Sequence, residues 1–172
     1  MTDQQEARLA VGSVAPRRAG IVNRYVTAAV DILAHETGGP VERGQVELQA
    51  NPYTTDDVTA VVGISGDVSG SLYLSMSEAT ALRIVGAMLG QAVSELDDIA
   101  KSGIAELANV IAGTAGVALG ASGLTTNISP PLLLHGAGAR LSAVDRQRLV
   151  VSLETGLGPV AVHVAVREPA GH

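Results

Sequence analysis

Apolar residues at every second position constrain the fold of this chain more than any other feature of its sequence. Val or Leu occupies every second position of 149–153 and of 160–166, on either side of the turn-forming sequence Gly156-Leu157-Gly158-Pro159. A second pair of alternating segments, 58–65 and 71–76, flanks a turn rich in glycine and serine. A period of two is typical of strands with one buried face, and a short turn between two such strands is typical of a β-hairpin. The sequence therefore predicts two hairpins.

Helical periodicity replaces this alternation in three other parts of the chain. The predicted elements are helices over 21–34, 78–89 and about 95–121, with short strands at 45–49 and 132–134. Ser77 is predicted as the N-cap of the second helix, and Gly90 as its end. Ser94, three residues before Asp97, gives the third helix a start that resembles a capping box. Two hairpins and three helices that do not alternate regularly with strands predict an α+β fold with a mostly antiparallel sheet.

Length and composition indicate one folded unit. A chain of 172 residues with 47% hydrophobic content can build one substantial core, and it is short for two domains. We assign 1–20 to a flexible N-terminal tail, 21–168 to the domain and 169–172 to a C-terminal tail. The core must be aliphatic, because the sequence has no Phe or Trp and only three Tyr. The polar start lacks the order of a secretory signal, so we expect a cytoplasmic protein.

Charge and residue content disfavour several classes of function. A net charge of −6 disfavours binding to nucleic acid, and the scarcity of aromatic residues disfavours base stacking. The chain has no Cys and its four His are widely spaced, so we expect no metal and no other cofactor in this chain. The most apolar stretch, 103–124, contains Glu106 and Asn109, and its uninterrupted part is shorter than the roughly 20 residues of a membrane span. No membrane segment is expected.

The long third helix has two chemically different sides. At about 100° per residue, the predicted buried side consists of Ile104, Leu107, Ile111, Ala115 and Ala118. The opposite side consists of Ser102, Glu106, Asn109, Gly113, Gly116 and Gly120. Glu106 and Asn109 are one helical turn apart, so their side chains are expected to point outward together.

The glycines on that outward side indicate a close approach by another element or molecule. A glycine inside a helix costs about 1 kcal/mol relative to Ala, and three of them follow the polar pair along one side. On spacing alone two interpretations stay open, because Glu-x-x-Asn is a common pattern. Either a partner protein binds here, or another helix packs on the glycines while Glu106 and Asn109 are only solvated.

The surroundings of this pair resemble a known protein family. The segments that carry the likeness are Met88-Leu89-Gly90, Ser94-Glu95-Leu96-Asp97-Asp98 and the run from Ser102 to Gly113. Together they resemble the CheC/CheX/FliY chemotaxis phosphatases, whose signature is Asp or Ser, three residues, Glu, two residues, Asn and a downstream Pro. Ser102, Glu106 and Asn109 match this spacing, whereas the prolines at 130–131 fall a residue or two early. The single pair resembles CheX more than the two-site CheC.

The resemblance implies a phosphatase that hydrolyses the aspartyl phosphate of a CheY-like receiver domain. It implies Glu106 and Asn109 as the catalytic residues, with Asn109 orienting the attacking water and Glu106 pairing with the receiver's active-site lysine. Ser102 and Gly113 would belong to the partner-binding surface. Mg2+ is expected in the partner receiver and not in this chain, and family precedent implies a homodimer.

Two other functions stay open at this point. The chain could be a non-catalytic CheX-like module that binds a receiver or a flagellar switch component without hydrolysing anything. It could also be a structural dimerisation domain whose glycine stripe is the surface of self-association. Binding of a phosphorylated receiver would distinguish this last function from the other two.

Overall fold

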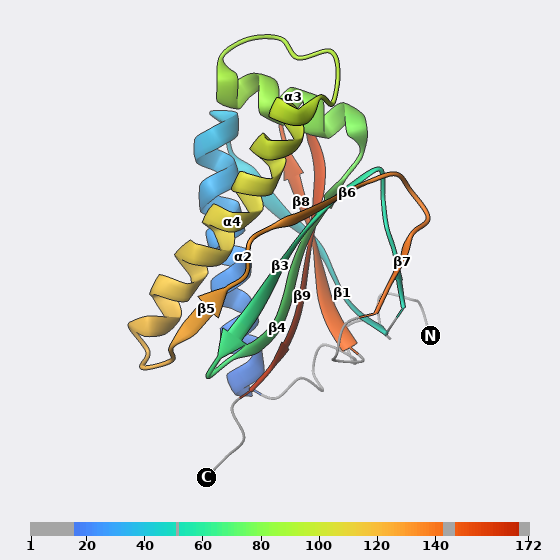
Figure 1. Ribbon diagram of the computed structural model, residues 1–172. Helices are drawn as coiled ribbons and strands as arrows, with labels where there is room; N and C mark the ends of the chain where they lie inside the picture. The colour runs from blue at the N-terminus through green and yellow to red at the C-terminus, as the bar shows by residue number, and fades with distance from the viewer. Residues whose placement is uncertain (1–15, 51, 143–146, 169–172) are drawn as a thin grey trace.

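In the computed structural model, which describes residues 16–50, 52–142 and 147–168, the chain forms a sheet with helices packed against it (Figure 1). The helices described are α2 (Pro16–Thr37), α3 (Glu78–Leu89) and α4 (Asp98–Gly120). The strands described are β1 (Val41–Ala50), β2 (Tyr53–Thr54), β3 (Val58–Gly66), β4 (Ser69–Met76), β5 (Thr126–Ile128), β6 (Leu132–His135), β7 (Arg140–Leu141), β8 (Gln147–Thr155) and β9 (Gly158–Arg167). The seven-stranded sheet has the order β1-β8-β9-β4-β3-β5, with β6 also paired to β3. Its pairings are antiparallel, which confirms the predicted α+β fold.

Both predicted hairpins are present and lie side by side in the sheet. β3 pairs with β4, and β8 pairs with β9 up to Thr155 and Gly158, which leaves a two-residue turn. The hairpins are joined because β4 also pairs with β9. Residues of the inward faces, such as Leu72, Leu74 and Val162, are fully buried. The period of two in the sequence therefore reflects the alternation between the helix-covered face and the outer face of the sheet.

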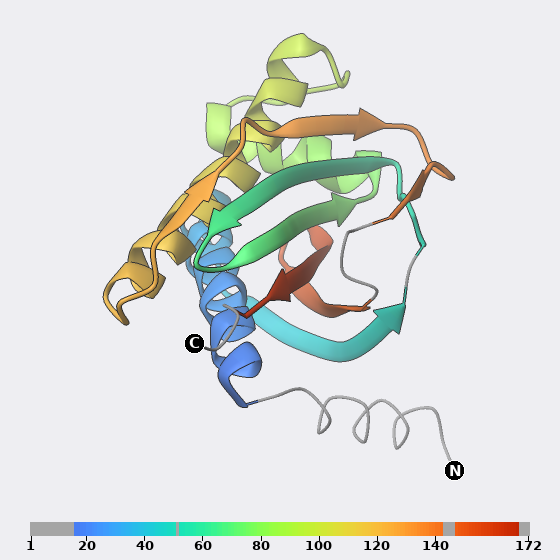
Figure 2. The ribbon, with the colours of Figure 1, turned by 60° about the horizontal axis from the view of Figure 1, so that its bottom comes forward.

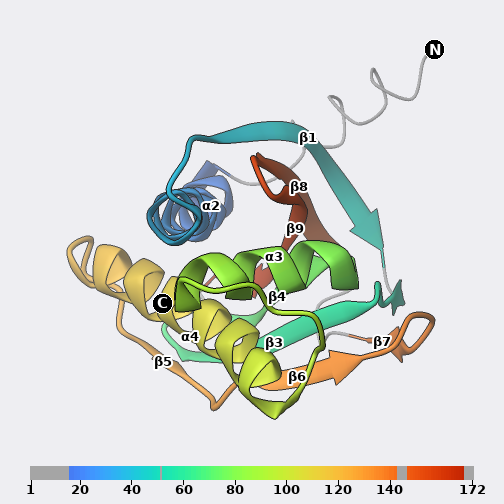
Figure 3. The same ribbon diagram turned by 90° about the horizontal axis from the view of Figure 1, so that it is seen from above.

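The helices supply the other half of an aliphatic core. Figures 1 and 3 show α2 and α4 against one face of the sheet, while α3 crosses one end of the strands. Leu33 of α2, Ile84 of α3 and the pair Ile104 and Ile111 of α4 are fully buried. Burial of a large aliphatic side chain contributes about 1.5–3 kcal/mol, so these residues fix each helix by its apolar side.

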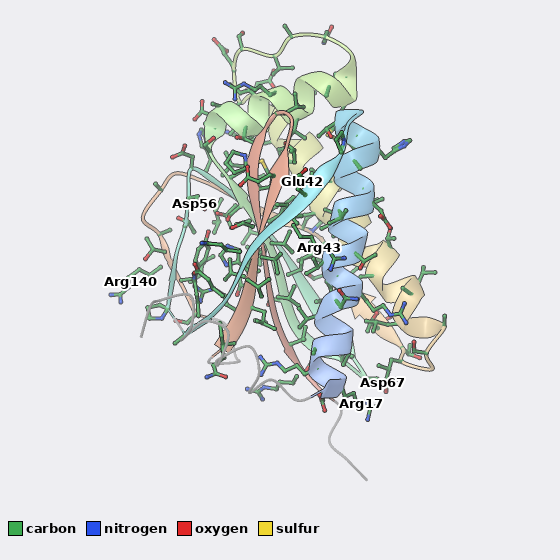
Figure 4. The ribbon with its side chains drawn as sticks, turned by 180° about the vertical axis from the view of Figure 1, so that it is seen from behind. Arg17, Glu42, Arg43, Asp56, Asp67 and Arg140 are labelled. Carbon is green, nitrogen blue, oxygen red and sulfur yellow. The ribbon has the colours of Figure 1, made fainter. Side chains whose placement is uncertain are left out.

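The edge strand β1 is tied to α2 by side-chain hydrogen bonds. It is longer than the predicted strand and pairs with β8, with a shift of register after Arg43. The Arg43 guanidinium donates to Oδ1 of Asn23 at 2.9 Å and to Oγ1 of Thr27 at 2.8 Å. Figure 4, which views the molecule from behind, shows Arg43 between β1 and α2. The helix is therefore anchored at this edge.

The start of α2 differs from the prediction. The helix begins at Pro16, five residues before the predicted start at Ile21 and inside the segment 1–20 that the sequence predicts as tail. Proline suits the first turn of a helix, because the backbone N–H that it lacks has no partner there in any case. The apolar pattern missed this turn because Arg17, Ala19 and Gly20 are exposed or polar.

The predicted caps are confirmed for α3 and only partly correct for α4. α3 starts and ends as predicted, with the Ser77 side chain accepting a hydrogen bond from the backbone N–H of Thr80 and with Gly90 in the left-handed conformation at φ 66°. The predicted start of α4 at Ser94 is wrong. Its N-cap is Asp97, whose carboxylate accepts from the backbone N–H of Ala100 at 2.8 Å. A carboxylate at this position also interacts favourably with the helix dipole, which explains the preference.

The segment after α4 forms an interrupted strand that the sequence predicted only in part. β5 and β6 both pair with β3, and Ser129, Pro130 and Pro131 lie between them. Ser129 fills the gap, because its N–H donates to the Gly63 carbonyl at 2.9 Å and its hydroxyl accepts from the Gly63 N–H at 2.9 Å. Prolines cannot donate to a ladder, so the pairing stops where they stand. Figure 2 shows β5 running beside α4.

The outer face of the sheet carries a buried arginine beneath the small β2–β7 sheet, which the sequence did not predict. The guanidinium of Arg148, 3% exposed, donates to the Ala50 carbonyl at 3.0 Å and to Oε1 of Gln49 at 2.7 Å. Its Nε donates to Nδ1 of His163 at 3.2 Å, and its carbon Cζ lies 4.8 Å from the centre of the Tyr53 ring. Hydrogen bonds and a cation–π contact thus compensate for the burial of this charge.

His163 completes this outer-face cluster as a neutral base. Its Nδ1 accepts from Arg148, so its other nitrogen carries the proton and donates to the Ser75 hydroxyl at 3.1 Å. Burial, and after it the charge of Arg148, lowers the pKa of His163 to about 3. Both ring nitrogens are therefore used in hydrogen bonds between strands of the sheet, and neither is free to bind a ligand.

Within the described residues one helix, α4, is long and apolar enough to cross a membrane on length and composition alone. The core helix of a globular domain passes the same test. In α4 the large apolar residues Ile104, Leu107 and Ile111 are buried against the rest of the chain. The criterion is therefore weak support for a membrane span here.

Candidate functional site

The packing of α4 fixes which of its sides faces outward. Leu96, buried just before the N-cap, and the Asp97 cap set the entry of the helix. The predicted buried side is confirmed at Ile104, Leu107, Ile111 and Ala115, while Ala118 is only half-buried. The opposite side is exposed over much of its length, although β5 packs beside it near Gly116, and Figure 1 shows α4 drawn in front of α2.

The structure places the predicted polar residues together on that outward side. Ser102 and Glu106 are exposed, Asn109 is half-buried, and Gly113 follows one turn later, half-buried as well. Residues three or four positions apart on a helix are neighbours, so these four form one continuous stripe. Their role in a reaction or in binding stays a prediction.

The side-chain polar groups of this stripe have no partner in the part of the chain that the structure describes. Within the described ranges the side chains of Ser102, Glu106 and Asn109 make no hydrogen bond or ion pair with another residue. An asparagine carboxamide can accept two hydrogen bonds and donate two, and a carboxylate is a strong acceptor. Glu106 and Asn109 thus present a negative charge, a donor and an acceptor, one turn apart, to whatever meets this side of the helix.

The glycines of the same side have different surroundings. A Cβ on Gly116 would lie 2.9 Å from Oγ1 of Thr126, so any other residue here would displace the Thr126 side chain of β5. A Cβ on Gly113 would have its nearest neighbour at 4.0 Å, the Cδ1 of Ile128, and one on Gly120 would have no atom of the described residues within 4 Å. The close strand therefore accounts for Gly116, in place of the packed helix considered from the sequence, while nothing in the described part of the chain requires a glycine at position 113.

Other polar residues of the helices lie elsewhere. The side-chain oxygen of Asn23 accepts a hydrogen bond from Arg43 on the β1 side of α2. His135 at the end of β6 pairs with Glu78 at the start of α3 at 3.0 Å, so both residues belong to other elements than α4. Among the residues that the structure describes, no group of three or more His, Asp or Glu could hold a metal ion. The stripe on α4 remains the candidate site.

Sequence reasoning missed the apolar residues of the outward side. Ile99, Val110 and Val117 are exposed to 67%, 38% and 78% respectively. The helical wheel that placed Glu106 outward also places these three residues within about 40° of it. The signal was thus present, but apolar residues of an amphipathic helix are assigned to the core by default.

Comparisons with known proteins converge on one family. The model of the family described as chemotaxis phosphatase CheX matches residues 58–154, a range that contains the whole of α4. The CheY-P phosphatase CheX of Thermotoga maritima is 30% identical over 126 residues, which cover 73% of this chain and 81% of that protein.

Solved structures agree with this match. A chemotaxis protein CheX from Desulfovibrio desulfuricans superimposes with a TM-score of 0.77 at 29% identity, covering 86% of this chain and 99% of that one. A complex of CheX with CheY, beryllofluoride and Mg2+ from Borrelia burgdorferi gives a TM-score of 0.74 at 25% identity, covering 86% and 97%.

Proposed function

Because this chain belongs to the CheX family of chemotaxis phosphatases, we propose that it hydrolyses the aspartyl phosphate of a CheY-like receiver domain, using Glu106 and Asn109 of α4. The observation that carries the assignment of residues is the free pair itself. Glu106 is exposed and Asn109 half-buried on one side of a helix, and within the described part of the chain neither side chain has a partner. The family supplies the reaction, and the pair supplies groups suited to it.

The reaction requires little covalent chemistry from this chain. The oxygen of a water molecule attacks phosphorus in line, and the bond between phosphorus and the aspartyl oxygen breaks. The products are inorganic phosphate and the free carboxylate of the receiver. For such a transfer, catalysis rests mainly on positioning and on electrostatic stabilisation. Asn109 would hold the water, its carboxamide oxygen accepting a hydrogen bond from the water and its NH2 group donating hydrogen bonds to the phosphoryl oxygens.

Glu106 would anchor the receiver, because its carboxylate can pair with the cationic side chain of a lysine beside the phosphorylated aspartate. Its charge is not committed to any group within the described residues, so the pair would form without breaking an internal one. Ser102 lies one turn before Glu106 and Gly113 one turn after Asn109, so these two residues would border the contact with the receiver. The half-buried Gly113 leaves space for a close approach of the partner.

The Mg2+ of the reaction is assigned to the receiver. Its role there is to neutralise charge on the phosphoryl group. The outward side of α4 offers Glu106 as a single carboxylate between Ile99 and Gly120, which is too few ligands for a protein site for this ion. On family precedent, the same proposal includes a cytoplasmic location and a homodimer. Size-exclusion chromatography with light scattering tests the homodimer.

The decisive experiment follows a phosphorylated CheY-like receiver in time, with and without the chain. Accelerated release of inorganic phosphate at substoichiometric concentrations supports the phosphatase. Binding to the beryllofluoride-activated receiver without acceleration supports instead the non-catalytic module. If the chain neither binds the receivers of the source organism nor accelerates their dephosphorylation, the proposal is contradicted. The structural dimerisation domain would then be the one remaining function of the three.

A further inference from the structure

The outward side of α4 is unusually apolar for a helix face in contact with water. Ile99, Val110 and Val117 are exposed to 67%, 38% and 78%, and between Ile99 and Gly120 the single charged residue on this side is Glu106. Scattered exposed apolar residues are ordinary, but aligned ones mark a surface for interaction.

The three apolar residues and Glu106 form one line along the helix. Ile99 lies seven positions before Glu106 and Val117 eleven after it, both close to whole numbers of turns, and Val110 is its i+4 neighbour. With a rise of 1.5 Å per residue, the line from Ile99 to Val117 is about 27 Å long. Glu106 therefore lies inside an apolar strip that is long enough for a protein interface.

We infer that Ile99, Val110 and Val117 are the apolar contact through which the receiver is bound, so that the docking surface runs the length of α4 around Glu106. This inference rests on the proposed function and extends it from the reacting pair to the residues that determine affinity. The partner surface that fits has one cation surrounded by apolar side chains. Each interface of this kind gains most of its affinity from a few buried apolar residues near a satisfied charge.

The isolated carboxylate favours a receiver over the other possible occupants. A membrane surface would bury Glu106 without a cation, which is costly, and this side of α4 carries no basic residue to attract anionic lipids. A second copy of the same strip would bring a second carboxylate and no countercharge. A cationic group on a different protein compensates for the burial of Glu106.

Distance along the helix separates these residues from the chemistry. Ile99 lies about 15 Å and Val117 about 12 Å from Asn109 along the axis, at 1.5 Å per residue. Neither can touch the reacting atoms. They are expected to change the affinity for the receiver, seen as Kd and KM, and not the rate of the bound complex, kcat.

The test uses the double variant Ile99→Ser and Val117→Ser in the full chain, with Val46→Ser as control. Val46 is also exposed, to 39%, but lies on β1 at the opposite edge of the sheet. We expect the double variant to raise Kd for a beryllofluoride-activated receiver, and KM for dephosphorylation, about tenfold, with kcat unchanged. Val46→Ser should leave all three constants as in the wild type.

Several outcomes would overturn the inference. Wild-type Kd in the double variant, with wild-type circular dichroism, would show that the strip is not part of the contact. Loss of self-association by light scattering, or of binding to vesicles of anionic lipid, with unchanged receiver affinity would assign the strip to a second copy or to a membrane. If the wild type itself binds no receiver while remaining folded, the proposed function fails first, and the inference falls with it.

Discussion

Two groups of polar residues in this protein have opposite relations to the rest of the chain. In the outer-face cluster under β2 and β7, Arg148 and His163 are each 3% exposed and bonded to several neighbours. On the outward side of α4, Glu106 and Asn109 have no partner among the described residues. The first group shows polar chemistry used to hold the fold, and the second shows polar chemistry left available to another molecule.

The contrast has a simple energetic reason. A buried guanidinium must be hydrogen-bonded within the protein, because the loss of its hydration is otherwise uncompensated. An exposed carboxylate stays hydrated and costs the fold little until a partner displaces the water. Substitutions should therefore separate the two groups, those in the outer-face cluster changing stability and those on α4 changing function.

The largest effect on stability is expected for Arg148→Met. This change leaves the Ala50 carbonyl, Oε1 of Gln49 and Nδ1 of His163 without their donor. We expect the free energy of unfolding in urea to fall by about 3 kcal/mol. Phosphatase activity per folded molecule should stay within about twofold of the wild type. A stable but inactive Arg148→Met protein would break the proposed division of roles.

Glu106→Lys should give the opposite result. The residue is exposed and has no partner within the described chain, so the unfolding free energy should change by less than about 0.5 kcal/mol. Repulsion of a cation on the receiver should raise Kd at least about tenfold, measured by titration with the beryllofluoride-activated receiver. The Kd of Glu106→Gln, which removes the charge without reversing it, should lie between that of the wild type and that of Glu106→Lys. Equal affinities in all three proteins would reduce Glu106 to a surface residue.

His163 predicts a specific dependence of stability on pH. Burial lowers its pKa to about 3, whereas an unfolded His titrates near 6.5, so below about pH 6.5 the unfolded chain binds a proton that the folded chain does not. Stability from this residue is complete above pH 6.5 and is lost as the pH falls toward 3. Between pH 7.5 and 5.5 the loss should be about 1 kcal/mol.

A His163→Gln variant isolates this contribution. The change in unfolding free energy between pH 7.5 and 5.5 should be smaller in the variant by that amount, since the other titrating groups contribute equally to both proteins. An identical pH dependence in the two proteins would mean that the pKa of His163 is the same in the folded and the unfolded chain, and would contradict its burial as a neutral base.

The smallest effect is expected from two glycines of α4. Gly113→Ala should raise the unfolding free energy by up to about 1 kcal/mol, because Ala favours the helix and its Cβ would have its nearest neighbour at 4.0 Å. Gly116→Ala should give no such gain, since Oγ1 of Thr126 at 2.9 Å must move. If Gly113 borders the receiver, its Ala variant gains stability while losing affinity. A gain in both would remove Gly113 from the contact surface.

Much of the fold follows from short-range patterns, and what the sequence concealed depends on tertiary contacts. Alternation predicted both hairpins, and Ser77 and Gly90 fixed the ends of α3 because caps act through local hydrogen bonds. Ser94 and Asp97 both satisfy the local rule for a helix start, and burial of Leu96 accompanies the choice of Asp97. The short strands β2, β5 and β7 are paired with distant segments, so no local period marks them.

The candidate site was predictable in its orientation and not in its extent. The spacing of Glu106 and Asn109 places them on the side opposite Ile104 and Ile111, as the structure confirms. Ile99 and Val117 were not predicted as part of the site, because hydrophobicity alone does not distinguish a residue buried inside the chain from an exposed residue of a binding surface. Exposure in the folded protein makes that distinction.

The central claim is tested most directly by the dephosphorylation rate of a saturating phosphorylated receiver in the presence of Asn109→Ala. The matched control is Asn127→Ala, which removes another exposed asparagine, on β5. Asn109→Ala should lower kcat about 100-fold or more, with binding of the activated receiver and the Tm retained, and Asn127→Ala should behave as the wild type. An unaltered kcat in Asn109→Ala would contradict the account.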